Sequence, residues 1–344
     1  MIRSLGMLRN CQLRSAQLAQ TLPPLRAAAN RQIHEDRCVV GSSFGMNDHT
    51  IQVYGANTEV GKTVISAGLC RAATSQGFQA SYIKPVQTGD VSDAVFVSRH
   101  APTCRTKSLF NFTDPVSPHL AAARDSAPTS DLDVLSAVIA EIEHVLERGP
   151  RNEGATPTDG DCVGTLTLVE TAGGVLSPAP SGSLQADVFR PMRLPVLLVG
   201  DGRLGGIGAT LSALESLRVR GYTVLGIALL GQEADLGNMG AISHHSGDIP
   251  VFELGALPPP DVALEPWYEA QGAAFDSALR VLVRARAALG QELATSAERA
   301  LESVWWPFTQ HSGLGEGAVT VLDSAYGDCY NTVTIEREGR EEGK

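Results

Sequence analysis

Apolar residues recur between about residue 50 and residue 254 in short runs that alternate with segments of helical periodicity. The short runs predict β-strands at residues 51–56, 80–86, 165–169, 195–199, 223–230 and 249–254. Apolar positions spaced three and four residues apart predict helices at residues 63–76, 131–147 and 207–220. Strands that alternate with helices indicate the α/β class, with a mostly parallel sheet and helices on both faces.

Pattern and composition divide the chain into four segments. We expect an N-terminal targeting segment at residues 1–37, an α/β domain at 47–260, a helical linker at 261–303 and a short extra C-terminal segment at 304–344. The last segment contains a strand-like stretch at residues 318–322 and a charged end. A segment of about 40 residues rarely folds alone, so we expect this one to be the beginning of a longer domain.

The first 34 residues contain five arginines and no acidic residue. This composition is typical of a mitochondrial transit peptide; a plastid transit peptide and a merely disordered basic tail are the alternatives. Without these five charges the formal net charge of −11 becomes about −16, which argues against nucleic acid as a partner. No apolar run reaches the roughly 18 residues needed to cross a bilayer, so we expect no membrane partner.

The segment Gly55-Ala-Asn-Thr-Glu-Val-Gly-Lys-Thr63 joins a predicted strand to a predicted helix. In that arrangement backbone N–H groups and a helix N-terminus point toward a phosphate. Lys62 adds a positive charge over the phosphates, and the Thr63 hydroxyl can bind Mg²⁺. Five residues separate the first glycine from Gly61, one more than in the common phosphate loop, so this is a variant loop.

Lysine is rare in this chain: it occurs only at positions 62, 84, 107 and 344, beside 23 arginines. Lys62 lies in the glycine-bounded loop, and Lys84 lies in the strand followed by Thr88-Gly89. A compact ammonium suits a tight anion site that a guanidinium does not fit. These two lysines are therefore candidates for chemistry rather than for solubility.

Several polar and glycine-rich segments directly follow predicted strands, and ligands of parallel sheets bind at those carboxyl ends. Glu170 ends one strand, beside Ala172-Gly173-Gly174, and is a candidate Mg²⁺ ligand. Asp93, at the head of a helix-like stretch, is the second candidate, with Asp90 and Asp201 as alternatives. A helix-start acid such as Asp93 can also serve only the helix dipole.

Four motifs occur together in one order: the loop 55–63 with Thr58-Glu59 inside it, Lys84-Pro-Val-x-Thr88-Gly89, Ser117-Pro-His119 and Val169-Glu-x-Ala-Gly-Gly174. In this combination the chain resembles dethiobiotin synthase over about residues 47–260. Leu184-Gln185 and the segment 190–206 resemble the eukaryotic form, in which the synthase is fused to 7,8-diaminononanoate aminotransferase. The resemblance implies a P-loop NTPase-like fold.

The resemblance also implies a reaction: ATP- and Mg²⁺-dependent ring closure of 7,8-diaminononanoate with CO₂ to dethiobiotin, in biotin synthesis. Lys62 and Lys84 would be catalytic, with Lys84 stabilising the carbamate. Thr58 and Thr88 would bind substrate. Thr63, Asp93 and Glu170 would carry Mg²⁺, and the ATP-binding residues would be Glu59, Val60, Gly61, Lys62, Thr63, Asp93, Glu170, Thr171, Ala172, Gly173 and Gly174. A homodimer is implied as well.

Two features depart from, or extend beyond, the synthase pattern. Gly231-Gln232-Glu233 follows the strand 223–230 where bacterial members place an adenine-reading Asn. Residues 305–323, beginning Trp305-Trp-Pro-Phe-Thr-Gln-His311, resemble the opening of the aminotransferase. Pyridoxal phosphate chemistry needs a lysine, and Lys344 is the only one beyond residue 107, so we expect no aminotransferase activity from this chain. A separate aminotransferase is a possible partner.

Two other functional classes are consistent with a variant phosphate loop. Nucleotide-switch ATPases of the partitioning type usually carry a further lysine early in the loop, and residues 56–60 contain none. A cobyrinate-type amidotransferase would need a glutaminase domain, for which the residues after 260 leave no room. A purely structural protein would not need Lys62, Lys84 and Glu170 together.

Overall fold

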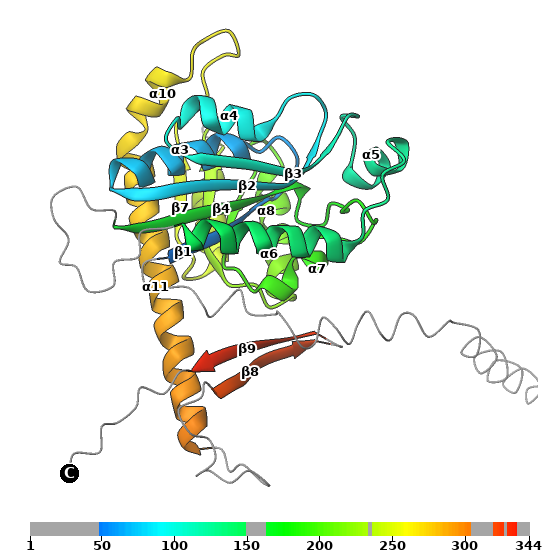
Figure 1. Cartoon of the computed structure of the whole chain (residues 1–344). Coiled ribbons are helices and arrows are strands. Elements are labelled where there is room, and N and C mark those ends of the chain that lie inside the picture. The colour runs from blue at the N-terminus through cyan, green and yellow to red at the C-terminus, as the bar shows by residue number, and fades with distance from the viewer. Residues whose placement is uncertain (1–47, 149–162, 233–235, 304–318, 327–328, 336–344) are drawn as a thin grey trace, which may run out of the picture. The chain divides into compact units, whose positions relative to one another are not determined.

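The computed structural model describes residues 48–148, 163–232, 236–303, 319–326 and 329–335 (Figure 1). Its main sheet consists of β1 (Asp48–Gly55), β2 (Phe78–Thr88), β3 (Arg105–Phe112), β4 (Gly164–Gly174), β5 (Val196–Val199), β6 (Val224–Leu230) and β7 (Val251–Leu254). The seven strands lie in the order β3-β2-β4-β1-β5-β6-β7, and every neighbouring pair is parallel. The predicted α/β fold is confirmed.

The helices connect successive strands and cover both faces of the sheet. They are α3 (Lys62–Ser75), α4 (Asp93–His100), α5 (Pro118–Arg124), α6 (Asp131–Glu147), α7 (Gln185–Val188), the 3₁₀ helix η1 (Arg190–Met192), α8 (Gly206–Arg218), α9 (Asn238–Ser246), α10 (Glu265–Ala270) and α11 (Gly272–Ser303). A two-stranded antiparallel sheet, β8 (Val319–Tyr326) and β9 (Cys329–Ile335), follows them in the chain.

The helix predicted at residues 131–147 has those bounds in the structure. It starts at a capping box: the Ser130 hydroxyl accepts from the Asp133 N–H, and the Asp133 carboxylate accepts from the Ser130 N–H. Such a pair satisfies two otherwise unbonded donors at a helix start. Strand β3 was not predicted, because it lies at the sheet edge and alternates exposed polar residues such as Arg105 and Lys107 with half-buried ones.

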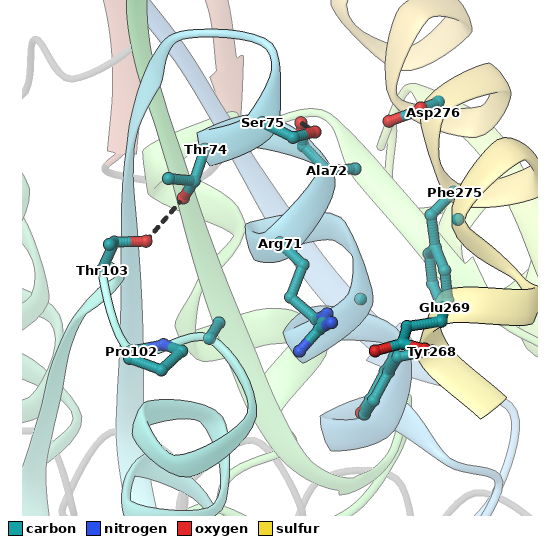
Figure 2. A pocket seen from close by; sticks show the side chains of 13 residues that line it. Arg71, Ala72, Thr74, Ser75, Pro102, Thr103, Tyr268, Glu269, Phe275 and Asp276 are labelled. Atoms are coloured by element: carbon teal, nitrogen blue, oxygen red, sulfur yellow. Dashed lines mark hydrogen bonds between the residues drawn. The ribbon is translucent and has the colours of Figure 1, made fainter. Parts of the chain in front are cut away.

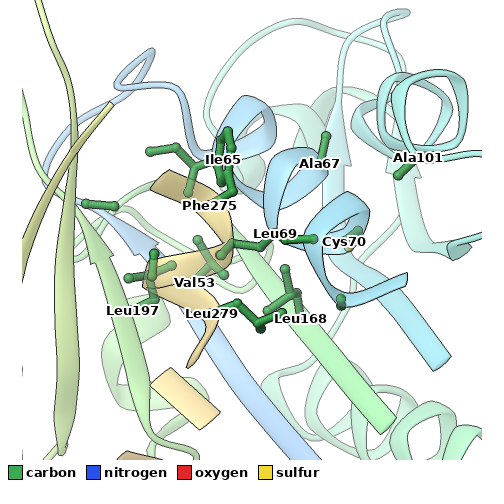
Figure 3. Close-up of a cluster of buried hydrophobic side chains, with 14 of the residues drawn as sticks. Val53, Ile65, Ala67, Leu69, Cys70, Ala101, Leu168, Leu197, Phe275 and Leu279 are labelled. Carbon is green, nitrogen blue, oxygen red and sulfur yellow. The ribbon is translucent and has the colours of Figure 1, made fainter. Parts of the chain in front are cut away.

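Alternation along the strands divides the core between the two faces of the sheet. Val53, Leu168 and Leu197, from three neighbouring strands, point toward α3 and α11, where they meet Ile65, Leu69, Phe275 and Leu279 (Figure 3). The opposite face packs against α5 and α6 at one end of the sheet and against α8 and α9 at the other. Helix α3, which begins with Lys62, is therefore fixed on the buried central strands of the sheet.

The segment expected to be a helical linker is helical, but its first half belongs to the core. Trp267, Tyr268, Phe275 and Leu279 are buried, and the Tyr268 hydroxyl donates to the carbonyl of Val64 on α3. The large apolar residues of α10 and of the start of α11 thus pack against α3. The apolar periodicity of this segment predicts a helix but does not predict which other element covers it. The core of the α/β domain therefore includes side chains beyond residue 260, where the sequence placed the start of the linker.

The contact between α3 and α11 requires a glycine. A Cβ atom on Gly68 would overlap the Phe275 ring, whereas one on Gly208 of α8 would meet no atom within 4 Å. We expect Gly68→Ala to lower the free energy of unfolding by about 1–3 kcal/mol, because overpacking forces neighbours off their rotamers. Gly208→Ala, the matched control, should raise it by about 0.5–1 kcal/mol through helix propensity. Urea unfolding of both variants tests this, and equal values would contradict it.

Two sequence predictions lie outside the described residues: the transit peptide at residues 1–37 and the aminotransferase-like motif at 305–311. The strand-like stretch at 318–322 falls largely within β8, which pairs with β9. Among the described residues, no helix is both long and apolar enough to cross a membrane.

Candidate active site

The loop between β1 and α3 has the compact geometry that its glycines allow. Gly61 has a φ of 89°, and a Cβ atom there would overlap the side chain of Leu230 at the end of β6. A Cβ on Gly55 would lie 2.8 Å from the carbonyl oxygen of Asn57 and 2.9 Å from Nζ of Lys62. Glu59 also has a positive φ of 59°, which is uncommon for a residue with a side chain. The loop therefore wraps closely around the Lys62 ammonium.

Lys62 is folded back onto backbone carbonyls. Its Nζ donates to the carbonyl oxygen of Gly173 at 2.7 Å and to that of Asn57 at 3.5 Å. Burial lowers the pKa of Lys62 to about 8; the charge of Lys84 acts in the same direction, whereas that of Glu170 opposes it. Incoming phosphate oxygens could replace the two carbonyls and restore the proton affinity.

Glu170, on β4, is fully buried and joins three elements. Its Oε1 accepts from Thr63 Oγ1 at 2.8 Å and from Lys84 Nζ at 2.9 Å, and its Oε2 accepts from Ser66 Oγ at 2.8 Å. Burial alone would raise the pKa of Glu170, but the charges of Lys84 and Lys62 together with these hydrogen bonds hold it below its usual value. The carboxylate is therefore ionised and has a hydrogen-bond donor on each oxygen.

Lys84, on β2, lies between two carboxylates. Besides Glu170, its Nζ contacts Asp93 Oδ2 at 2.6 Å, and it lies 3.4 Å from the carbonyl oxygen of Thr171. Burial would lower the pKa of Lys84, but the negative charges of Glu170 and Asp93 outweigh burial and raise it. Lys84 is thus a buried, charged ammonium with two anionic partners.

Asp93, and not Asp90, is the helix-start acid at this site. It is the first residue of α4, whose N-cap Ser92 accepts from the Val95 N–H. The backbone N–H of Asp93 donates to Oε1 of Gln87 at 3.0 Å, which ties the helix start to β2. Asp90 is exposed. The metal-binding role of Asp93 stays a prediction.

Hydrogen bonds from neighbouring segments hold the predicted nucleotide-contacting stretch 171–174. Thr171 Oγ1 donates to the carbonyl of Val53 on β1, and the Gly174 N–H donates to Ser177 Oγ. The side-chain amide of Gln185 accepts from the N–H of Ala172 at 3.1 Å and donates to its carbonyl at 2.8 Å. Strand β4 also runs through Gly174, beyond its predicted end at residue 169.

The remaining predicted residues line the same edge of the sheet. Val60 is buried, so only its backbone can face a ligand. Thr58 is exposed in the loop, where its carbonyl accepts from Arg203 Nη2 at 3.5 Å. Thr88 ends β2 and is half-buried. Asp201, considered as an alternative metal ligand, is instead held by Arg203, whose Nε and Nη2 each lie 2.8 Å from its carboxylate.

Sequence reasoning missed Ser66 and Gln185 as supporting residues. Ser66 lies one helical turn after Thr63, so the i, i+3 spacing on α3 places both hydroxyls on the face toward Glu170. That spacing was available in the sequence. Gln185 lies 13 residues after Ala172, beyond the range of helix or strand periodicity, so no local pattern pairs them.

Gln185 provides a test of how firmly the glycine stretch is held. We expect Gln185→Leu to lower the free energy of unfolding by about 1–3 kcal/mol, because it leaves the half-buried N–H and carbonyl of Ala172 without their side-chain partner. Gln232→Leu is the matched control, since Gln232 is exposed at the end of β6 and should change stability by less than about 0.5 kcal/mol. Denaturant unfolding measures both, and an unchanged stability of Gln185→Leu would contradict the assignment.

The oxygen donors at this edge fit Mg²⁺. Thr63, Asp93 and Glu170 supply one hydroxyl and two carboxylates. Thr63 Oγ1 lies 2.8 Å from Glu170 Oε1, and Lys84 Nζ lies 2.9 Å from the same oxygen and 2.6 Å from Asp93 Oδ2. Mg²⁺ typically takes one or two protein carboxylates and completes its octahedron with phosphate and water. The described residues contain no group of three or more His, Cys, Asp or Glu side chains placed to hold a metal, which leaves this smaller donor set as the candidate.

A cavity of about 430 Å³ lies elsewhere, along the second half of α3 (Figure 2). Arg71 points into it, with its guanidinium carbon 5.2 Å from the centre of the Tyr268 ring, and Thr74 and Thr103 are joined by a hydrogen bond across its wall. It contains none of the predicted site residues. The chemistry therefore concentrates at the start of α3, and not in this cavity.

Comparison with known proteins identifies the family of the chain. A family model described as "AAA domain" matches residues 49–265. The ATP-dependent dethiobiotin synthetase BioD of Paramagnetospirillum magneticum is 34% identical over 209 residues, which cover 60% of this chain and 87% of that protein. The chain belongs to the dethiobiotin synthetase family.

Longer members of this family extend the similarity. The bifunctional dethiobiotin synthetase/adenosylmethionine-8-amino-7-oxononanoate aminotransferase of Emericella nidulans is 39% identical over 323 residues, 88% of this chain. A mitochondrial bifunctional dethiobiotin synthetase/7,8-diamino-pelargonic acid aminotransferase of Arabidopsis thaliana is 32% identical over 349 residues, 83% of this chain. The chain spans only 39% and 41% of the length of these two relatives.

Proposed function

We propose that this chain closes the ureido ring of dethiobiotin from 7,8-diaminononanoate, CO₂ and ATP. The observation that supports this most directly is Lys84, a charged lysine beside a phosphate loop in a member of the dethiobiotin synthetase family. Such a cation suits a reaction whose intermediates are anions formed from the substrate itself. No nucleophilic side chain is then required.

The steps balance with the groups at hand. One substrate amine adds to CO₂ and loses a proton, which gives a carbamate. A carbamate oxygen attacks the γ-phosphorus of ATP, so that ADP leaves and a carbamic-phosphoric anhydride forms. The second amine then attacks the carbonyl carbon and loses a proton, the bond from that carbon to the phosphate oxygen breaks, and the ring closes as phosphate leaves. The protein contributes positioning and charge neutralisation, which dominate phosphoryl transfer.

Individual residues divide these tasks. Lys62 and the backbone N–H groups of Glu59–Thr63 would hold the triphosphate. Lys84 would neutralise the carbamate and the anhydride that forms from it. Thr58 and Thr88, on the same edge, would hydrogen-bond the substrate. Mg²⁺ bound to Thr63, Asp93 and Glu170 would neutralise phosphate charge.

Phosphate release by the full chain tests the proposal. With MgATP and bicarbonate present, we expect release only when 7,8-diaminononanoate is added, and a decrease of about 10²–10³-fold in Lys84→Ala, because a charge-stabilising group is lost. Lys107→Ala, on the exposed edge strand, is the matched control and should retain full activity. Steady ATP turnover that ignores the diamine would refute the proposal and favour the nucleotide-switch alternative.

The pKa of Lys62 gives a pH-dependent expectation. With a pKa of about 8, Lys62 is largely neutral at pH 9 in the free protein, and the phosphates of a bound nucleotide should return its proton. Nucleotide binding at pH 9 should therefore take up nearly one proton, whereas binding at pH 6.5 should take up close to none at this residue. Calorimetry in buffers of different ionisation enthalpy measures the uptake. Lys62→Met should abolish the pH 9 component, and its persistence there would contradict the assignment.

We infer three further properties from the sequence and the relatives. Mitochondrial targeting is supported by the basic, acid-free N-terminus and by the plant relative described as mitochondrial. A homodimer is implied by the resemblance to the synthase family. A diaminononanoate aminotransferase partner is supported by the fusion in the bifunctional relatives.

A further inference from the structure

We propose that Lys84 and the metal ion compete for the same two carboxylates, so that binding of the metal–nucleotide complex releases Lys84 toward the substrate. The competition follows from the positions of Lys84, Asp93 and Glu170. The destination of the released ammonium rests on the proposed function. The reaction would then be ordered: the metal–nucleotide complex binds before the carbamate gains its stabilising cation.

The geometry places one cation between two anions. Nζ of Lys84 lies 2.6 Å from Asp93 Oδ2 and 2.9 Å from Glu170 Oε1. These carboxylates are the two candidate metal ligands, and the Thr63 hydroxyl contacts the same Oε1 at 2.8 Å. A divalent cation held by this set would therefore lie within a few ångströms of the ammonium, and like charges at that separation repel strongly in a buried site.

Charge balance points the same way. The buried lysines 62 and 84 and the carboxylates of Asp93 and Glu170 have no net formal charge as they stand. A divalent ion alone would add two positive charges to a region where Lys84 and Glu170 are almost completely buried. The triphosphate brings compensating negative charge, so the metal and the nucleotide should enter together.

Lys84 is able to move without a change in the backbone. Its ammonium ends a flexible four-carbon side chain, whereas Glu170 is held additionally by Ser66, and the helix start of Asp93 by Gln87. The Glu170 carboxylate and the backbone of Asp93 are therefore fixed, and the long lysine side chain is the more mobile partner. While Lys84 is neutralised by Asp93 and Glu170, it attracts a carbamate only weakly. After metal binding its charge is available to attract the carbamate strongly.

The chain has only four lysines, so their side-chain signals can be told apart by NMR in the full-length protein. In full-length protein labelled with ¹⁵N-lysine, Lys84→Met and Lys107→Met identify the corresponding side-chain Nζ signals. We expect the Lys84 signal to shift or broaden when Mg²⁺ and a non-hydrolysable ATP analogue are added together, and to stay in place with the analogue and EDTA. The Nζ signal of Lys62 should report nucleotide binding in both samples, with Mg²⁺ and with EDTA. A Lys84 signal that does not change at saturation with Mg²⁺ and analogue would overturn the proposal.

Metal affinity gives a second readout. Without nucleotide, Lys84→Met should bind Mn²⁺ about tenfold or more tightly than the wild type, since the competing charge is gone, while Lys107→Met should match the wild type. Equal or weaker Mn²⁺ binding by a folded Lys84→Met would also overturn the proposal. Neither measurement requires turnover. An inactive chain with a metal-sensitive Lys84 signal would refute the proposed function alone, and an active chain with an insensitive signal would refute only the competition.

Discussion

Glu170→Leu should lower the free energy of unfolding by about 3–5 kcal/mol, because removing one partner of a buried ion pair leaves a charge without compensation. Glu170 is fully buried and receives hydrogen bonds from Thr63, Ser66 and Lys84. After the substitution Lys84 keeps one carboxylate partner, Asp93, which is partly exposed, and the Thr171 carbonyl. Urea unfolding at neutral pH measures the loss, and Glu253→Leu on β7 is the exposed control.

A double-mutant cycle separates the ion pair from simple loss of volume. We expect Lys84→Met combined with Glu170→Leu to be more stable than Glu170→Leu alone, because the uncompensated ammonium is then absent. The coupling free energy should be at least about 1 kcal/mol for groups in contact. Additive effects of the two substitutions would contradict the description of Lys84 and Glu170 as one electrostatic unit.

Lys62→Met should lower kcat/KM for ATP by about 10²–10³-fold, because a preset cation that neutralises developing phosphate charge is lost. Stability should change little or increase, since a lysine whose pKa is depressed to about 8 by burial destabilises the fold when charged. Steady-state kinetics and urea unfolding measure the two effects separately. A folded Lys62→Met with unchanged kcat/KM would contradict a role for Lys62 at the phosphates.

Lys107→Met is the matched control for this prediction. Lys107 lies on the exposed edge strand β3, so its removal deletes one lysine without touching the loop. Equal losses in both variants would point to a general effect of charge and not to the site. Lys62→Arg should not restore activity, because the guanidinium does not fit the space that Gly55 and Gly173 leave for the ammonium.

The pattern of apolar residues was sufficient for the parallel sheet and for the helices next to the site. Lys62 and Glu170 follow predicted strands, and Lys84 lies near the end of another. Because the carboxyl ends of parallel strands meet at one edge of the sheet, the sequence predicted that these residues lie close together. Contacts between distant segments were not predictable in this way. The packing of Phe275 against Gly68 depends on shapes far apart in the chain, and so does the clamp of Gln185 on Ala172.

The position of Asp93, whose metal-binding role stays a proposal, shows the same limit. The sequence offered Asp90, Asp93 and Asp201 at strand ends, and all three could have been ligands. The side chain of Gln87 fixes the start of α4, which brings Asp93 to Lys84, while Arg203 holds Asp201. Side-chain contacts therefore distinguish Asp93, which contacts Lys84, from Asp201, which is held by Arg203, and the spacing of residues in the sequence does not.

Fixation of ¹⁴C tests the account most directly. The full chain is incubated with [¹⁴C]bicarbonate, MgATP and 7,8-diaminononanoate, and the label that survives acid and gentle heating is counted, because a carbamate loses CO₂ under those conditions and a closed ureido ring does not. We expect acid-stable label equal in amount to the phosphate released, and about 10²–10³-fold less of both in Lys84→Ala. Phosphate release without acid-stable label would contradict ring closure.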